Sequence, residues 1–139
     1  MSFELEKAGC KLIATYPAPW VFVGKLFGHY PLEMLEPYIE AADRVIIGRG
    51  RTAHCFHDFS EMTTYETRCR QAMTEWAKQH HGDPPTAEHY ILVRSRMVAM
   101  GAATASMMLG GALKVFANKT RFEAAIADAV AQRKNGSAR

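Results

Sequence analysis

The segment from residue 54 to residue 58 holds the densest group of side chains that could do chemistry. It reads His54-Cys55-Phe56-His57-Asp58. A histidine beside an aspartate could act as a general base, and two histidines with a thiol could bind a metal. The surrounding residues favour a strand, however, and successive side chains of a strand point to opposite faces. We therefore expect neither a metal site nor a catalytic centre here.

A polar segment follows this strand and could contact a partner or carry a phosphoryl group. Its candidate residues are Asp58, Ser60, Thr63 and Thr64. Thr63 and Glu66 have the spacing of a capping box, which predicts a helix from about residue 64. A phosphoryl group on Thr63 or Thr64 would then face the positive end of the helix dipole. The simpler alternative, a well-capped helix start without a further role, is the one we favour.

A second polar group follows the apolar run at residues 90–93. It consists of Arg94, Ser95 and Arg96, at the expected start of another helix. Two guanidinium groups beside a helix N-terminus could hold a phosphate or a carboxylate. Together with His57 they form a candidate site for a small anionic or lipid-like ligand. The alternative is a pair of surface or salt-bridged arginines, and the sequence leaves both open.

The helix expected at residues 97–109 has no charged side chain. An ordinary helix on the surface of a sheet has a polar outer face, so this one should be covered on both sides or bind a partner. We favour an interface with a protein partner, including self-association, over a fully internal helix. The candidate interface residues are Met97, Met100, Thr104, Met107 and Met108.

Composition excludes several classes of protein. The chain has 139 residues, 48% hydrophobic and 22% charged, and a net charge of +3, which suits one globular domain. It has no basic stripe with interleaved aromatic residues, so we expect no nucleic-acid binding. No phosphate-binding glycine motif occurs, and we expect no cofactor. The N-terminus lacks the pattern of a signal peptide and no apolar run is long enough to span a membrane, which predicts a cytoplasmic protein. Three cysteines at long spacings are expected to be buried thiols.

The predicted elements place these groups in an α/β domain. Strands are expected at 3–16, 20–28, 52–59, 90–93 and 113–117, and helices at 31–45, 64–80, 97–109 and 120–132. The last helix has a second apparent capping box, Thr120 with Glu123. Strands that alternate with helices after an opening hairpin predict a mostly parallel four- to five-stranded sheet with about four helices. We expect one domain over residues 1–132 and a flexible tail at 133–139.

Two segments carry a resemblance to a known family. They are the run from His57 to Thr64 and the run Ala117-Asn118-Lys119-Thr120-Arg121-Phe122-Glu123-Ala124-Ala125. With the element order, they resemble the STAS (sulfate transporter and anti-sigma factor antagonist) family and its sporulation-antagonist-like and Sec14-like relatives. The resemblance implies a STAS-like fold and a regulatory role. Thr63-Thr64-Tyr65-Glu66 stands where that family has its phosphorylatable serine, and Glu66 would oppose a phosphate there.

Three functions remain, in order of preference. The first is a non-enzymatic regulatory or protein-interaction module resembling anti-sigma factor antagonists and acting through residues 97–109, and the second is a binding domain for a small anionic or lipid-like ligand. The third is an enzyme that uses His57 and Asp58. We place it last, because alternation along a strand directs these two side chains apart.

Overall fold

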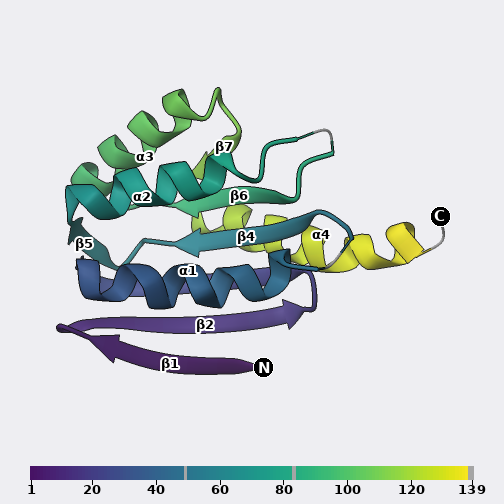
Figure 1. The fold of residues 1–139 in the computed structure, drawn as a ribbon, viewed down its shortest axis with the longest axis horizontal. Helices are drawn as coiled ribbons and strands as arrows, with labels where there is room; N and C mark the ends of the chain where they lie inside the picture. The colour runs from purple at the N-terminus through teal and green to yellow at the C-terminus, as the bar shows by residue number, and fades with distance from the viewer. Residues whose placement is uncertain (49, 83, 138–139) are drawn as a thin grey trace.

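A seven-stranded mixed sheet forms the centre of the molecule, with helices on both faces (Figure 1). The structure is a computed structural model that describes residues 1–48, 50–82 and 84–137, and the side chains among these up to residue 132. The strands are β1 (Ser2–Lys7), β2 (Cys10–Ala18), β3 (Val21–Tyr30), β4 (Ala53–Asp58), β5 (Met62–Tyr65), β6 (Ala87–Leu92) and β7 (Leu113–Phe116). The helices are α1 (Leu32–Ile46), α2 (Thr67–Lys78), α3 (Arg96–Met108) and α4 (Lys119–Ser137).

The strand order is β1-β2-β3-β4-β6-β7, with β5 paired to β3 beside the main path. Strands β1, β2 and β3 are antiparallel neighbours, whereas β3, β4, β6 and β7 run parallel. The parallel part is built from strand–helix–strand crossovers, the connection that parallel neighbours require. The predicted α/β class, with a largely parallel sheet behind an opening antiparallel part, is therefore confirmed.

The sheet has more strands than the four or five expected. One reason is a tight turn at Ala8 and Gly9, whose φ angles are +50° and +81°. This turn divides the run expected at residues 3–16 into β1 and β2, which pair from Ser2↔Thr15 to Lys7↔Cys10. Glycine reaches positive φ without a steric penalty, but nothing in the local sequence indicates that Ala8 does so as well. The turn was therefore not predicted.

The other reason is β5, which contains Thr63 and Thr64. These residues were expected at the start of a helix, and that prediction is wrong. They form a strand that pairs with the end of β3, beyond the last residue of β3 that β4 covers. β-branched residues suit a strand, and the exposed end of β3 supplies the partner backbone. Helix α2 begins at Thr67, and Glu66 precedes it without a side-chain cap.

The second apparent capping box is also not used. Helix α4 begins at Lys119, so Thr120 lies inside its first turn. The N–H of Arg121 instead donates to Oδ1 of Asn118 at 3.0 Å. Asparagine is a strong N-cap residue, and it precedes the helix here.

The two faces of the sheet carry different helices. Helices α1, α2 and α3 cover one face, where their buried residues pack with Phe22, Leu26 and Cys55. Helix α4 covers the other face, where Phe122 packs with Phe56. Because side chains of β4 alternate, Cys55 and His57 face α1 and α2 while His54 and Phe56 face α4.

None of the helices in the described residues is long and apolar enough to cross a membrane. The flexible tail expected at 133–139 falls on residues whose side chains are not described, and 138–139 lie outside the described residues altogether.

Candidate functional site

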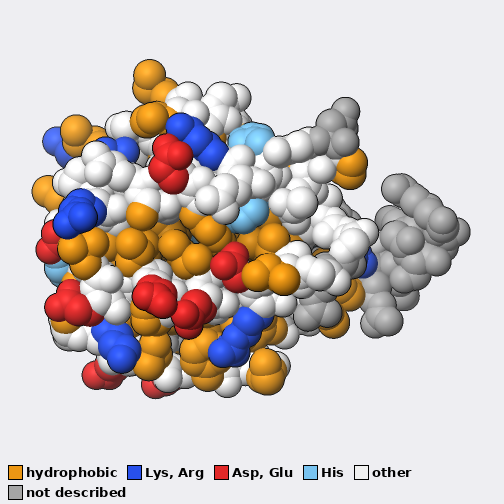
Figure 2. Space-filling model, in the orientation of Figure 1, with side chains coloured by type: hydrophobic (Ala, Val, Ile, Leu, Met, Phe, Trp, Pro, Cys, Tyr) orange, Lys and Arg blue, Asp and Glu red, His pale blue; other side chains and the backbone are white. Residues whose placement is uncertain are grey.

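Helix α3 has one face toward the sheet and one toward solvent. Val98, Gly101 and Ala102 are buried, whereas the methionines of the outer face are exposed, up to 83% for Met107. The outer face, which we call the methionine face, consists of Met97, Met100, Thr104, Met107 and Met108. Figure 2 shows hydrophobic side chains at the edge of the molecule where α3 lies. The helix was expected either to be internal or to offer an interface, and the structure places its methionines at the surface.

The predicted partner-contact residues Thr63 and Thr64 lie beside the first turn of α3. The Thr64 hydroxyl donates to Sδ of Met97 at 3.2 Å, and the Ser95 hydroxyl contacts the carbonyl oxygen of Thr63 at 3.5 Å. Strand β5 therefore continues the surface that begins with the methionine face. Thr63 and Thr64 were predicted as a site separate from the methionine face. The parallel pairing of β5 with β3 brings the two together.

Asp58 and Ser60 have a local structural role. Oδ1 of Asp58 accepts hydrogen bonds from the backbone N–H of Ser60 at 3.1 Å and from its hydroxyl at 2.6 Å. An aspartate that binds the backbone two residues later stabilises a turn. The pair fixes the connection between β4 and β5, and through it the position of Thr63 and Thr64.

The predicted anion-binding residues do not converge on one cavity. The side chain of Arg94 is 79% exposed and lies 4.0 Å from the carboxylate of Glu61. The Ser95 hydroxyl accepts from the N–H of Val98, as an N-cap of α3, and Arg96 is exposed. His57 is buried below the surface. Within the described residues, none of these three residues lines the cavity that His57 lines.

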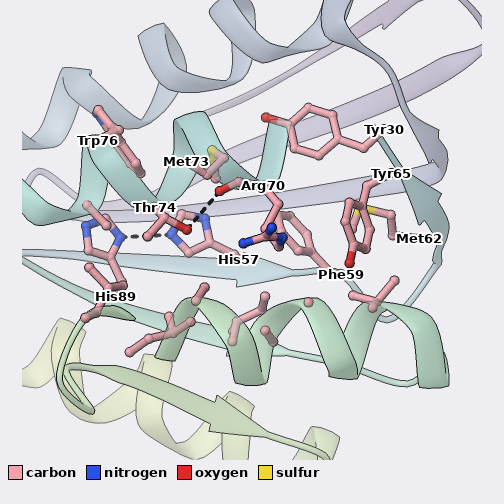
Figure 3. Close-up of a pocket in the computed structure, with 18 residues that line it drawn as sticks. Tyr30, His57, Phe59, Met62, Tyr65, Arg70, Met73, Thr74, Trp76 and His89 are labelled. Atoms are coloured by element: carbon pink, nitrogen blue, oxygen red, sulfur yellow. Dashed lines mark hydrogen bonds between the residues drawn. The ribbon is translucent and has the colours of Figure 1, made fainter. Parts of the chain in front are cut away.

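That cavity lies between α2, α3 and the sheet, and its volume is about 80 Å³ (Figure 3). Its walls are almost entirely apolar. Phe59 and Met62 lie at one end and Trp76 and His89 at the other. Small residues of the inner face of α3, such as Ala102, form the opposite wall. The cavity is partly open to solvent. Concave apolar sites with few polar groups are typical of small-molecule binding.

A chain of hydrogen bonds runs beneath the cavity from α1 to the end of α2. The Tyr38 hydroxyl lies 2.6 Å from Nδ1 of His57, whose Nε2 lies 3.0 Å from Nδ1 of His89. Nε2 of His89 lies 2.9 Å from Nδ1 of His80. Strand register causes this alignment, because Cys55 pairs with His89 and so His57 and His89 share one face of the sheet.

Burial keeps these imidazoles uncharged. It lowers the pKa of His57 to about 3 and the pKa of His89 well below its usual range, and His80 lowers both further. Burial also lowers the pKa of His80, although Asp43 opposes this. Trp76 packs its ring against His80 and His89, with centroids 4.8 and 4.9 Å away. The group is a neutral hydrogen-bonded chain in an aromatic setting.

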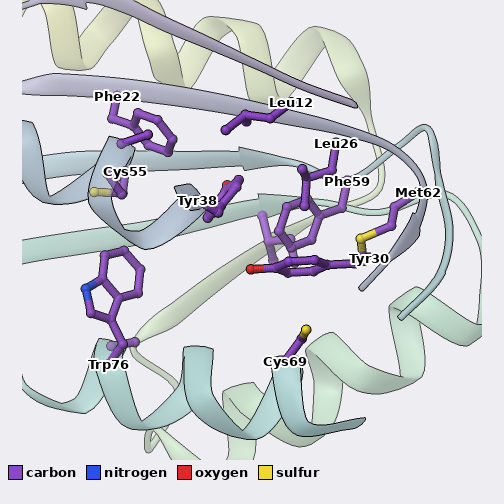
Figure 4. Packing of buried hydrophobic residues seen from close by; sticks show 14 of the residues in the cluster. Leu12, Phe22, Leu26, Tyr30, Tyr38, Cys55, Phe59, Met62, Cys69 and Trp76 are labelled. Carbon is purple, nitrogen blue, oxygen red and sulfur yellow. The ribbon is translucent and has the colours of Figure 1, made fainter. Parts of the chain in front are cut away.

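The Tyr30 hydroxyl has no such partner. Tyr30 lines the same cavity and is 2% exposed, and its Oη is buried without a hydrogen bond to any described residue. Figure 4 shows the hydroxyl directed away from Met62, toward the space beside Tyr38 and Trp76. Burial, with smaller contributions from Cys69 and Cys10, raises the tyrosine pKa well above 10.0. A neutral hydroxyl therefore points into an apolar space.

Metal binding gains no support from the part of the chain that the structure describes. No group of three or more histidine, cysteine, aspartate or glutamate side chains there could hold a metal ion. The three histidines are hydrogen-bonded in a row and do not converge on one point. The three cysteines are free and buried, as expected, and burial raises the pKa of Cys69 to about 11.

Sequence reasoning found His57 but missed its partners. Tyr30, Tyr38, His80 and His89 were not proposed as site residues. The available signal was His89 in an apolar strand, at the position that faces the same side as His57. Tyr38 carries no comparable signal, because a tyrosine on an amphipathic helix is ordinary.

The arrangement of strands and helices defines a SpoIIAA-like, and hence STAS-like, α/β fold. The chain is similar to an uncharacterised protein of the DUF3478 family with a SpoIIAA-like fold from Shewanella loihica PV-4. The two match with a TM-score of 0.57 and 11% identity over 91% of this chain and 92% of the other. This likeness concerns the fold alone. No family model and no curated protein matches the chain.

Proposed function

We propose that the chain is a non-enzymatic regulatory module that acts by binding a protein surface through the methionine face, with a second copy of itself as the partner. The SpoIIAA-like fold supports a regulatory role by its resemblance to anti-sigma factor antagonists. Fold alone does not assign a function, so the case depends on the surface.

The observation that carries the proposal is the exposure of large apolar side chains on α3. Met97, Met100, Met107 and Met108 are between 53% and 83% exposed. Methionine adapts to irregular surfaces, and exposed apolar patches mark interaction sites. Because the face carries no charge, two copies can meet across a two-fold axis without bringing like charges together.

The contacts of His57 and Asp58 support a non-enzymatic role. His57 uses both ring nitrogens in buried bonds to Tyr38 and His89, and Asp58 binds Ser60. A general base needs a nitrogen that can reach a substrate proton. The two side chains also lie on opposite faces of β4.

Thr63 and Thr64 extend the proposed interface and are a place where it could be regulated. A phosphoryl group on Thr64 would replace the contact with Met97 by a dianion at the end of an apolar surface. We propose that such a modification opposes docking. Thr64→Glu is expected to weaken self-association, and Thr64→Val to leave it intact.

Sedimentation equilibrium tests the interface. The unmodified protein is expected to dimerise as its concentration rises, and Met107→Glu to shift the dissociation constant upward by at least about tenfold, since a buried charge is costly. Ala127→Glu, at an exposed position of α4, is the matched control and should dimerise normally. A protein that stays monomeric, or a Met107→Glu variant that dimerises as well as the control, contradicts the proposal.

A further inference from the structure

We infer that the cavity beneath α3 is a binding site for a small, uncharged, mainly apolar molecule that offers one hydrogen-bond acceptor to the Tyr30 hydroxyl. This goes beyond docking through α3, because the ligand would contact the inner face of that helix and not the methionine face. The inference combines an apolar cavity that is partly open to solvent with a buried polar group that has no hydrogen-bond partner among the described residues.

The Tyr30 hydroxyl requires a partner. Nearly all buried polar side chains are hydrogen-bonded, because an unpaired one loses its bonds to water without replacement. Figure 3 labels Phe59, Met62, Met73 and Tyr65 at the same end of the cavity as Tyr30. The first three offer no strong acceptor, and the Tyr65 hydroxyl is directed toward Gly101 of α3. A water molecule is a poor substitute, because a buried water needs two to four polar partners. A ligand oxygen meets the requirement with one bond.

The chemistry of the walls selects an uncharged ligand. His57 and His89 are engaged in their own chain of bonds, so they neither neutralise an anion nor repel an apolar body. Arg70 lines the cavity and is partly exposed, and Figure 3 shows its guanidinium group directed away from the Tyr30 hydroxyl. A carboxylate at Tyr30 would therefore be a buried charge without a counter-charge, which is strongly unfavourable.

The size of the space selects a small ligand. The cavity volume is about 80 Å³, whereas an apolar cavity of about 150 Å³ accepts benzene. Gly101, Ala102 and Ala105 form the wall on α3, so larger side chains at these positions would fill the space. Benzene has six heavy atoms, so about half that volume holds a molecule of about three carbon atoms with a carbonyl oxygen, and acetone is a suitable probe. Propane has the same carbon chain without the acceptor.

Methionine methyl groups provide the readout. Met62 and Met73 line the cavity, whereas Met107 lies on the methionine face and serves as the internal control. With ¹³C-methyl methionine, titration with acetone is expected to shift the Met62 and Met73 signals to saturation and leave Met107 unchanged. Propane should bind about fivefold more weakly, the ratio that one hydrogen bond of ordinary net strength gives.

Two variants separate the hydrogen bond from the cavity. Tyr30→Phe keeps the ring and should make the affinities for the two probes equal. Ala102→Leu should abolish both titrations, whereas Ala103→Leu, one position along on the exposed side of α3, should preserve them. Absence of saturable shifts in the unmodified protein overturns the inference, and so does a preference for acetone over propane that persists in Tyr30→Phe. Tyr30→Phe decides the outcome even if Ala102→Leu fails to fold.

Discussion

The Tyr38 hydroxyl and Nδ1 of His57 lie 2.6 Å apart in the interior, and this contact sets the direction of a chain of three imidazoles. In His57 and His89, Nδ1 lies on the side of the chain that leads to Tyr38, and Nε2 contacts the next histidine. The chain ends at Nδ1 of His80. Neutral imidazoles have one N–H each, so all three must share one tautomer. If Nδ1 carried the hydrogen, the Tyr38 hydroxyl would accept from His57 and its own hydrogen would need another buried acceptor. We therefore expect Tyr38 to donate and each histidine to be protonated at Nε2.

Nitrogen NMR of the imidazoles tests this direction. His57, His89 and His80 are expected to show protonated Nε2 and unprotonated Nδ1 at neutral pH. Tyr38→Phe removes the donor and leaves Nδ1 of His57 unpaired, which should lower the free energy of unfolding by about 1–2 kcal/mol. Signals of protonated Nδ1 in these three rings would show that the chain runs the other way.

Stability should fall in mild acid because of the same histidines. The pKa of His57 is about 3 in the folded protein and 6.5 for an unperturbed histidine. Between these values the unfolded chain binds a proton that the folded protein does not, so lowering the pH favours unfolding. Above pH 6.5 neither state binds this proton, so His57 does not lower the free energy of unfolding. As the pH falls from 6.5 toward 3, the free energy of unfolding decreases progressively. From pH 7 to pH 5, His57 alone should cost about 2 kcal/mol, and His89 and His80 add to it.

Urea unfolding at the two pH values measures this loss. The fluorescence of Trp76, which touches His80 and His89, reports on the site once Trp20 is replaced by phenylalanine. His81→Gln is the matched control, because its side chain is exposed and outside the chain of bonds. Equal free energies of unfolding at pH 7 and pH 5 would mean that the histidines are not held uncharged by the fold.

Gly24 makes the Tyr38–His57 contact possible by leaving space on β3. A Cβ at this position would lie 2.6 Å from Cζ of Phe22 and 2.7 Å from the Tyr38 hydroxyl. Both neighbours are fully buried and cannot move away easily. Gly24→Ala should therefore lower the free energy of unfolding by about 1–3 kcal/mol, the usual cost of overpacking a core.

A double-mutant cycle tests whether the collision with the Tyr38 hydroxyl causes this loss of stability. In the Tyr38→Phe background one of the two collisions disappears, so Gly24→Ala should cost less there than in the unmodified protein. The comparison uses urea unfolding at pH 8, where His57, His89 and His80 are uncharged in both states. An identical cost in the two backgrounds would assign the effect to Phe22 or to the backbone, and not to the hydroxyl.

The sequence predicts much of the fold and only part of the site, for physical reasons. Helices α1, α2 and α4 and the parallel strands show in hydrophobic spacing, because local periodicity reflects a buried face. Strand β5 does not, because Thr63 and Thr64 join the sheet only when the end of β3 is available to pair with them. The histidine chain depends on the register of β4 against β6, which no local pattern encodes. Unpaired atoms such as the Tyr30 hydroxyl are properties of the packed interior, and composition cannot indicate them.

Asp58 gives the last prediction, because its position was expected to serve a phospho-switch or a partner and the structure shows a turn. Its Oδ1 accepts from both the N–H and the hydroxyl of Ser60. Asp58→Ala should lower the free energy of unfolding by about 1–2 kcal/mol through loss of these bonds, and Ser60→Ala should cost less, because the backbone N–H bond remains. Urea unfolding orders the two variants. Since this turn leads into β5, Asp58→Ala should also weaken dimerisation more than Ser60→Ala does. If Asp58→Ala impaired dimerisation without any loss of stability, the carboxylate would contact the partner directly instead of holding the turn.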